Sequence, residues 1–302
     1  MKQIMIVTGA SSGMGVCFAK QLALESATFR LMADRFLSRG KTKRAQEIRA
    51  QSADELWIIA RRAERLEETK QLIENDAAAW KASHAGQAAF PAVRAIPLDI
   101  GGKAGAMRVR ELLRSEEACS GKPPAITVLV NNAGFGTYGP FEATDPVREM
   151  DMVDLDCTAL TGITGFALPY MGPGARIINT ASLASFLPLG NFAVYGACKA
   201  YVLSFSVALA AELRERGVRV TALCPGPVST EFANVASRGA RTEVRHGLSP
   251  EKTVAHCLSR SRKGRLYALW AFRWKFQAAA SRWVPRFLGA WFTYRFCKRP
   301  SR

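Results

Sequence analysis

Short apolar runs alternate along the chain with longer segments whose apolar residues recur every three or four positions. The short runs predict buried strands at 4–8, 56–60, 93–98, 126–130, 176–180 and 218–223. Helical patterns separate nearly all of them, the first from Val16 to about Glu25 and the second through Leu66 and Leu72. Runs such as 126–130 are typical of strands covered on both faces of a parallel sheet. The alternation predicts an α/β fold, a doubly wound parallel sheet with helices on both faces and right-handed crossovers.

Three segments are longer than the strand and helix connections of such a fold require. Residues 26–53 and 75–92 lengthen the connections before the second and third strands, and both are expected to form surface helices or loops. Residues 261–302 follow the last helix of the domain, which Ser249-Pro250-Glu251 is expected to begin. We therefore predict one domain over residues 1–260, with insertions near 26–53 and 75–92, and a C-terminal extension over 261–302.

Composition narrows the class of protein. The chain has 302 residues, 48% hydrophobic and 22% charged, which is typical of a globular protein. No run approaches the ~18 apolar residues that a membrane-spanning helix needs, and the N-terminus enters a strand at once, which leaves no room for a signal peptide. The seven cysteines form no CxxC pair and no cluster with His84, His246 or His256. These patterns predict no metal site, no disulfides and a cytoplasmic location.

A glycine-rich turn follows the first strand directly. Its sequence is Thr8-Gly9-Ala10-Ser11-Ser12-Gly13-Met14-Gly15, and a helix pattern begins at its end. Glycine permits a tight turn and lets backbone N–H groups approach a pyrophosphate at the positive helix N-terminus. In isolation such a turn is equally compatible with a plain strand–helix connection. Its place after the first strand favours a dinucleotide site.

Further motifs follow in order. They are Asn131-Asn132-Ala133-Gly134 after the fourth strand, Ser182 after the fifth, Tyr195-Gly-Ala-Cys-Lys199, and Pro225-Gly226-Pro227-Val228-Ser229-Thr230 after the sixth. With the G-x-x-x-G-x-G spacing of the turn, the series resembles the short-chain dehydrogenase/reductase family over roughly residues 3–260. The resemblance implies a Rossmann-like fold, a nicotinamide cofactor, and a homo-oligomer.

The residues that carry the chemistry are Tyr195, Lys199 and Ser182. Tyr195 and Lys199 are four positions apart and therefore lie on the same face of a helix. A phenol with a pKa near ~10 is a poor acid–base group at neutral pH, and a neighbouring ammonium would lower that pKa. Ser182 could hold the substrate oxygen by a hydrogen bond. A Tyr-x-x-x-Lys pair alone would fit an ordinary helix surface, but the other motifs in register favour catalysis.

The family resemblance assigns roles to these residues. It implies that Tyr195 is the acid/base group, that Ser182 binds the carbonyl, and that Lys199 tunes the pKa of Tyr195 and holds the nicotinamide ribose. It implies further cofactor contacts, with Asp99 and Ile100 at the adenine and Thr230 at the carboxamide. The full set of expected cofactor contacts is Thr8, Gly9, Ser11, Ser12, Gly13, Met14, Gly15, Arg61, Arg62, Asp99, Ile100, Asn132, Ala133, Gly134, Tyr195, Lys199, Pro225, Gly226, Val228 and Thr230.

Asp156 departs from the family pattern, which usually has Asn thirteen residues before a Pro-x-Met such as Pro169-Tyr-Met171. In the family that Asn helps to hold a water that links the lysine to solvent. Asp can accept the same hydrogen bond but cannot donate one, and its charge would oppose the effect of Lys199 on Tyr195. Two interpretations stay open: a tolerated near-isostere in the catalytic relay, or a shifted pH optimum and a weakened enzyme.

The end of the second strand indicates which nicotinamide cofactor is used. An acidic residue there would bind the ribose 2′-hydroxyl of NAD(H). The strand ends instead in Ala60-Arg61-Arg62, and arginine can bind a 2′-phosphate through charge-assisted hydrogen bonds. NADP(H) is therefore favoured over NAD(H), although Arg61 and Arg62 could also merely begin a solvated helix face.

The C-terminal extension is strongly basic. The chain carries a net charge of +17, of which the 13 Lys and Arg residues from Lys252 onward, with no Asp or Glu among them, contribute +13. Trp283, Phe287 and Trp291 recur on one face of a predicted helix. Three interpretations compete: packing of this face on the domain or on another subunit, a peripheral anchor on an anionic membrane, and nucleic-acid binding, which no recognition motif supports.

These features together predict an NADP-dependent oxidoreductase that interconverts a ketone and a secondary alcohol. The aromatic extension favours a hydrophobic substrate such as a 3-oxoacyl thioester or a hydroxysteroid. Phe232, Val235 and Leu248 could line its pocket or could be packing residues. The alternative function is that of a catalytically weak NADP-binding protein that acts in interaction or redox sensing, which the Asp156 departure keeps open. We expect a cytoplasmic protein, with 262–302 as the candidate membrane contact.

Overall fold

The computed structural model describes residues 1–84, 89–241, 244 and 247–301. The strands are β1 (Gln3–Thr8), β2 (Glu55–Ala60), β3 (Ala92–Pro97), β4 (Ala125–Asn131), β5 (Arg176–Thr180), β6 (Arg219–Leu223) and β7 (Tyr267–Ala268). The α-helices are α1 (Gly13–Leu37), α2 (Thr42–Arg49), α3 (Ala63–Ser83), α4 (Gly102–Ser120), α5 (Pro146–Val153), α6 (Leu160–Ala167), α7 (Ala193–Glu212), α8 (Phe232–Ala236), α9 (Pro250–Arg262), α10 (Phe272–Ala280) and α11 (Arg286–Phe296). Short 3₁₀ turns are η1 (Phe141–Ala143), η3 (Leu168–Tyr170), η4 (Leu183–Phe186) and η5 (Ser281–Trp283), and η2 (Asp154–Ala159) is a π-helical segment.

All seven strands form one parallel sheet in the order β3-β2-β1-β4-β5-β6-β7. The predicted doubly wound α/β fold is therefore confirmed, and each of the six predicted strands overlaps an observed one. The two-residue strand β7 was not predicted, because two residues are too few to form a hydrophobic pattern. The chain reverses its winding direction between β1 and β4, which is where open sheets of this kind bind ligands beyond the carboxyl ends of their strands.

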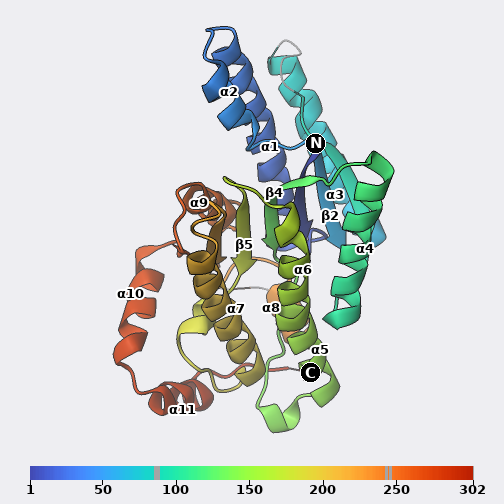
Figure 1. Cartoon of the computed structure of the whole chain (residues 1–302). Coiled ribbons are helices and arrows are strands. Elements are labelled where there is room, and N and C mark those ends of the chain that lie inside the picture. Colours follow the sequence, from blue (N-terminus) through green and yellow to red (C-terminus); the bar gives the residue numbers. More distant parts are fainter. Residues whose placement is uncertain (85–88, 242–243, 245–246, 302) are drawn as a thin grey trace.

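Helices cover both faces of the sheet (Figure 1). Successive strand residues point to opposite faces, so Met5 and Val7 pack under α1, α3 and α9, whereas Ile4 and Ile6 pack under α4, α6 and α7. Helix α7 is the one described helix that is long and apolar enough to cross a membrane. It nevertheless buries Val202 and Leu209 in the interior of this domain.

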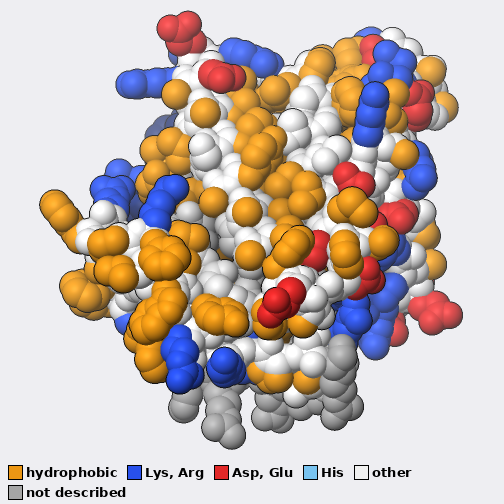
Figure 2. Space-filling model, turned by 90° about the horizontal axis from the view of Figure 1, so that it is seen from below, with side chains coloured by type: hydrophobic (Ala, Val, Ile, Leu, Met, Phe, Trp, Pro, Cys, Tyr) orange, Lys and Arg blue, Asp and Glu red, His pale blue; other side chains and the backbone are white. Residues whose placement is uncertain are grey.

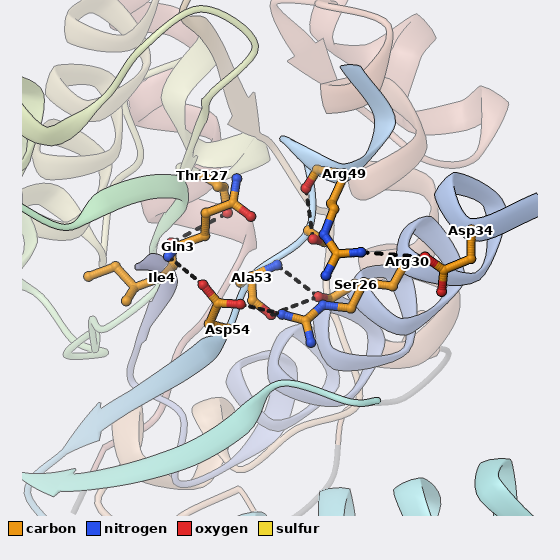
Figure 3. A network of polar contacts seen from close by, with 10 residues as sticks. Gln3, Ile4, Ser26, Arg30, Asp34, Arg49, Ala53, Asp54 and Thr127 are labelled. Carbon is orange, nitrogen blue, oxygen red and sulfur yellow. Dashed lines mark hydrogen bonds and ion pairs between the residues drawn. The ribbon is translucent and has the colours of Figure 1, made fainter. Parts of the chain in front are cut away.

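The insertion expected at 26–53 is mostly a continuation of a helix. Helix α1 runs on to Leu37, well beyond the sheet, and α2 folds back along it as a projecting hairpin (Figure 1). The base of the hairpin is joined to the start of β2 by polar contacts (Figure 3). In these contacts Arg30 donates to the Ala53 carbonyl at 2.7 Å and to Asp54 Oδ1 at 2.7 Å, and Asp54 Oδ2 accepts from the Gln3 N–H at 2.8 Å.

The second insertion likewise prolongs a helix. Helix α3 continues to Ser83 before the chain returns to β3 at Ala92, and residues 85–88 of the predicted insertion lie outside the described residues.

The C-terminal extension forms two helices instead of one. Trp283 belongs to the 3₁₀ turn η5, and Val284 and Pro285 adopt extended backbone before α11 begins at Arg286. Proline has no N–H and ends a preceding helix readily, so the predicted single face from Trp283 to Trp291 is interrupted. Figure 1 shows α10 and α11 at the end of the molecule opposite to the α1–α2 hairpin.

Candidate active site

A cavity of about 1360 Å³ lies at the carboxyl edge of the sheet. The segments that follow β1, β2, β3, β4, β5 and β6 all contribute to its wall. Its volume exceeds the ~300–1,000 Å³ of ordinary small-molecule sites, so it has room for more than one ligand.

The glycine-rich turn forms one wall of the cavity. Gly9 and Gly13 have φ of +67° and +53°, a region that favours glycine. A Cβ on Gly9 would lie 2.7 Å from Ala133 Cα, so only glycine lets the first turn approach the loop after β4. Helix α1 starts at this turn without a side-chain cap on its first N–H groups and without an acidic residue in its first turn. Uncapped N–H groups at a helix N-terminus form a site for an anion such as a pyrophosphate.

Thr8 fastens the glycine-rich turn to β4. Its hydroxyl accepts from the N–H groups of Asn132 at 3.0 Å and Ala133 at 3.1 Å, while the Asn132 side-chain amide donates to the Thr8 carbonyl at 3.2 Å. Thr8 is buried and does not line the cavity. It supports the two loops that do.

Tyr195, Lys199 and Ser182 converge on another wall of the cavity. Tyr195 and Lys199 lie one turn apart on α7, with the Lys199 Nζ 5.5 Å from the centre of the Tyr195 ring. Ser182 precedes η4, and its hydroxyl is close enough to Tyr195 to lower the pKa of the phenol. The Tyr195 ring stacks on Phe192 at 4.1 Å between ring centres. The three predicted catalytic side chains are therefore neighbours, and the phenol is held in one orientation.

Asp156 lies behind this wall as the ion-pair partner of Lys199. Its Oδ2 is 2.8 Å from Lys199 Nζ, and both side chains are almost completely buried. The π-helical turn η2 carries Asp156, and such turns often mark functional sites. Lys199 also donates to the Thr180 carbonyl at 3.1 Å. Asp156 does not line the cavity, so it acts on the site through Lys199.

The charged groups of the site have opposite effects on the pKa of the Tyr195 phenol. Burial raises the pKa of Tyr195, the Lys199 ammonium and the Ser182 hydroxyl lower it, and the Asp156 carboxylate raises it. The net pKa of Tyr195 lies above its ordinary value of 10.0. Lys199 thus acts in the predicted direction, but burial and Asp156 outweigh it. Burial lowers the pKa of Lys199, yet Asp156 and Tyr195 raise it more, so Lys199 stays charged at neutral pH.

Arg61 and Arg62 both line the cavity at the end of β2. Arg62 donates to Ser11 Oγ at 3.2 Å and pairs with Glu231 Oε2 at 3.3 Å. Asp99 and Ile100 lie beside them after β3. The Asp99 carboxylate accepts from the Gly101 N–H at 3.0 Å, which shapes the loop.

Most of the predicted site residues meet in this one cavity. Those that line it are Gly9, Ser11, Ser12, Gly13, Met14, Arg61, Arg62, Asp99, Ile100, Asn132, Ala133, Gly134, Ser182, Tyr195, Lys199, Pro225, Gly226, Val228 and Thr230. Thr8, Gly15 and Asp156 stand immediately behind it. Among the possible substrate contacts, Phe232 and Val235 reach the cavity, but Leu248 pairs with Val228 by a β-bridge instead.

The C-terminal extension forms part of the cavity wall, which the sequence analysis did not predict. Trp274 packs against Gly226, where a Cβ would lie 2.4 Å from the indole ring. Val284, Leu288 and Phe292 form the wall beyond it. A helical pattern shows which residues share a face but not which distant loop that face meets. Only the glycines opposite the extension, such as Gly226, could have indicated a close approach.

No described group of three or more His, Cys, Asp or Glu side chains is placed to hold a metal ion. The polar groups that line the cavity around Tyr195 are a phenol, an ammonium and a hydroxyl.

Comparison with known proteins gives consistent results. A family model described as short chain dehydrogenase matches residues 111–240. The sulfoacetaldehyde reductase of Chromohalobacter salexigens is 32% identical over 247 residues, which cover 79% of this chain and 78% of that protein.

Two solved structures share the fold. A short-chain dehydrogenase from Sphingobium yanoikuyae in complex with NADPH has a TM-score of 0.67 at 24% identity, with 93% of this chain and 94% of that chain covered. A short-chain dehydrogenase/reductase from Burkholderia phymatum in complex with NAD has a TM-score of 0.67 at 19% identity, with 92% of each chain covered.

Proposed function

This chain belongs to the short-chain dehydrogenase/reductase family and is an NAD(P)-dependent oxidoreductase of CH–OH and C=O groups, and from that premise we propose that it uses NADP(H) to interconvert a hydrophobic ketone and its secondary alcohol. The convergence of Tyr195, Lys199 and Ser182 on a cavity whose opposite wall is the glycine-rich turn carries the proposal. The roles below are part of it.

The residues of the cavity fit a dinucleotide. The turn from Gly9 to Gly13 has the close backbone approach and the free helix N-terminus that a pyrophosphate needs. Lys199 and the loop of Asn132 to Gly134 would hold the ribose next to the nicotinamide, and Thr230 the carboxamide. When bound, the cofactor donates a hydride to the substrate carbonyl or accepts one from the alcohol.

Tyr195 supplies the proton in carbonyl reduction. Ser182 holds the carbonyl oxygen by a hydrogen bond, and the Tyr195 hydroxyl donates its proton to that oxygen. Because the pKa of Tyr195 lies above 10.0, the phenol is protonated at neutral pH and is ready to act as an acid. The charged Lys199 then stabilises the phenolate that remains. In alcohol oxidation the same groups work in reverse.

The preference for NADP(H) is supported by charge at the adenosine end of the cavity. The residues at the end of β2 are Arg61 and Arg62, where a carboxylate would be needed to hold a 2′-hydroxyl. The Arg62 guanidinium already contacts Ser11, so it lies within reach of a phosphate held by the same turn. A 2′-phosphate would compete with Glu231 for Arg62.

The hydrophobic substrate is supported by the lining near Tyr195. Phe135, Tyr138, Leu189 and Phe232 surround this end of the cavity, and α11 adds Leu288 and Phe292. Such a surface removes an apolar substrate from water.

A small anionic carbonyl compound is the second candidate. The name of the sulfoacetaldehyde reductase indicates a substrate of this class. One observation favours it here, since the guanidinium of Arg299 lies in the cavity wall, 5.2 Å above the ring of Phe192.

The test is consumption of NADPH, and separately of NADH, with a panel of carbonyl compounds. The panel should contain medium-chain ketones, 3-oxoacyl thioesters, oxosteroids and sulfonated or carboxylated aldehydes. We expect turnover with the apolar ketones and a higher kcat/KM with NADPH than with NADH. Faster turnover of the anionic aldehydes would favour the second candidate, and a preference for NADH would contradict the role given to Arg61 and Arg62. Tight NADPH binding without turnover of any compound would favour the catalytically inactive alternative.

Replacing Asp156 with Asn tests whether its charge sets the pH dependence. Asp156 raises the pKa of Tyr195, and removing its charge leaves the Lys199 ammonium unopposed, so the pKa of Tyr195 should fall. Alcohol oxidation needs the phenolate, so its rate in the variant should rise at lower pH than in the wild type. Carbonyl reduction needs the phenol, so its loss at alkaline pH should also begin earlier.

The measurement is kcat against pH in both directions. Asp151→Asn, which neutralises an exposed carboxylate at the same cavity, is the matched control and should leave both profiles in place. Identical profiles for wild type and Asp156→Asn would show that Asp156 is a tolerated replacement for Asn.

A further inference from the structure

The C-terminal extension carries most of the exposed aromatic surface of the molecule. Ten of the 22 exposed large apolar side chains of the described residues lie between Phe272 and Phe296. We define the tail patch as Phe272, Phe276, Trp283, Phe287 and Trp291, which are 82%, 67%, 89%, 77% and 51% exposed. Figure 2 shows hydrophobic and basic side chains gathered at the left of the view, where α10 and α11 lie. From these observations we propose that the tail patch docks the enzyme on an anionic lipid bilayer.

The patch is exposed although its helices are firmly attached. Helix α11 packs on the domain through Gly289, where a Cβ would lie 2.5 Å from the Leu187 side chain. The Asn191 side-chain amide donates to the carbonyl of Tyr294 at 2.9 Å, and Thr293 Oγ1 accepts from the Gly190 N–H at 2.8 Å. One side of α11 therefore faces the domain. Trp283 and Phe287 are mostly exposed and Trp291 is half exposed, so the domain leaves much of the aromatic face uncovered.

The charges beside the patch are of one sign. Arg273, Lys275, Arg282, Arg286 and Arg295 are exposed, and α10 to α11 contains no acidic residue. Each cation near the surface of an anionic membrane is attracted to its lipid phosphates. Tryptophan and phenylalanine favour the headgroup level of a bilayer, where the ring is buried and the neighbouring cations meet lipid phosphates.

The same charges argue against a second copy of this chain as the binding partner of the tail patch. A twofold interface places the same face of both subunits in contact. The tail patch would then bring arginines against arginines, because these helices offer no carboxylate to pair with them. A negatively charged lipid surface complements both the aromatic rings and the cations.

The tail patch lies next to the cavity, so docking would bring the cavity close to the membrane. Val284, Leu288 and Phe292, which line the cavity, belong to the same stretch of chain as Trp283, Phe287 and Trp291. A docked enzyme would hold this wall of the cavity against the apolar phase in which hydrophobic ketones dissolve. This use rests on the proposed hydrophobic substrate, whereas docking itself does not.

The experiment is co-sedimentation of the full chain with vesicles of phosphatidylcholine and phosphatidylglycerol, against vesicles of phosphatidylcholine alone. We expect binding to the anionic vesicles that weakens as salt is added. Arg282→Gln/Arg286→Gln should weaken it about tenfold or more, because two surface cations are lost. Trp283→Ser/Phe287→Ser should lower it further and should remove the blue shift of tryptophan fluorescence on binding. None of these residues lines the cavity, so NADPH binding should be unchanged and reports that each variant is folded.

The matched control is Lys43→Gln/Arg44→Gln, which removes two exposed cations from α2 at the other end of the molecule and should bind like the wild type. Equal binding by wild type and all variants would overturn the proposal, as would no binding of the wild type to either vesicle. The free protein could instead sediment as a dimer, bind no lipid, and become a monomer in Trp283→Ser/Phe287→Ser. That result would assign the tail patch to a subunit interface. Lipid binding without ketone turnover would leave docking in place and would contradict only the proposed function.

Discussion

Tyr195→Phe is expected to lower kcat for carbonyl reduction by about 10²–10⁴-fold, which is the usual contribution of a positioned general acid. The variant lacks only the hydroxyl that donates the proton. The ring keeps its stacking on Phe192 and its place beside Lys199, so the cavity keeps its shape. NADPH binding, measured by fluorescence titration, should therefore change little, while steady-state turnover falls.

One control makes this result specific. Tyr138→Phe removes a hydroxyl from the same cavity and should retain most of the activity, because Tyr138 is not paired with Lys199. Turnover by Tyr195→Phe within a fewfold of the wild type would refute the assignment of the proton donor.

Gly15→Ala is expected to abolish NADPH binding and to destabilise the protein. A Cβ at this position would lie 2.0 Å from the Gly9 carbonyl oxygen and 2.9 Å from Ala10 Cα. Both atoms belong to the backbone of the glycine-rich turn, so no side chain can move aside and the turn must open. Such overpacking costs ~1–3 kcal/mol, and the displaced N–H groups could no longer converge on a phosphate. Fluorescence titration with NADPH and thermal unfolding measure the two effects.

Gly165→Ala is the matched control for this substitution. Gly165 lies in α6 with open space where a Cβ would stand, so alanine should leave NADPH binding intact and should stabilise the helix by ~0.5–1 kcal/mol. NADPH affinity in Gly15→Ala equal to that of the wild type would show that the turn does not form the cofactor site.

The sequence predicted the sheet and the groups around Tyr195 for the same physical reason. Strands buried on both faces are apolar along their whole length, and the motif residues lie at the strand ends and the helix turn that the fold requires. Asp156 could also be found from its spacing. The sequence could not predict that Asp156 forms a buried ion pair with Lys199, or that burial keeps the pKa of Tyr195 high. Both depend on surroundings that only the folded chain shows.

The C-terminal extension was less predictable. A helical period shows that residues share a face, but it does not show that the pattern breaks at Pro285 or that Gly289 permits contact with Leu187. The attachment of α11 depends on Asn191, more than a hundred residues earlier, whose side-chain amide binds backbone carbonyls. Backbone carbonyls are common to all residues and leave no trace in a sequence pattern.

The attachment of α11 also sets an order of events during synthesis. The sheet is complete once β7 has been made, whereas Val284, Leu288 and Phe292 emerge from the ribosome later. In a nascent chain, the glycine-rich turn and the catalytic pair of α7 are therefore synthesised before the wall that α11 adds to the cavity.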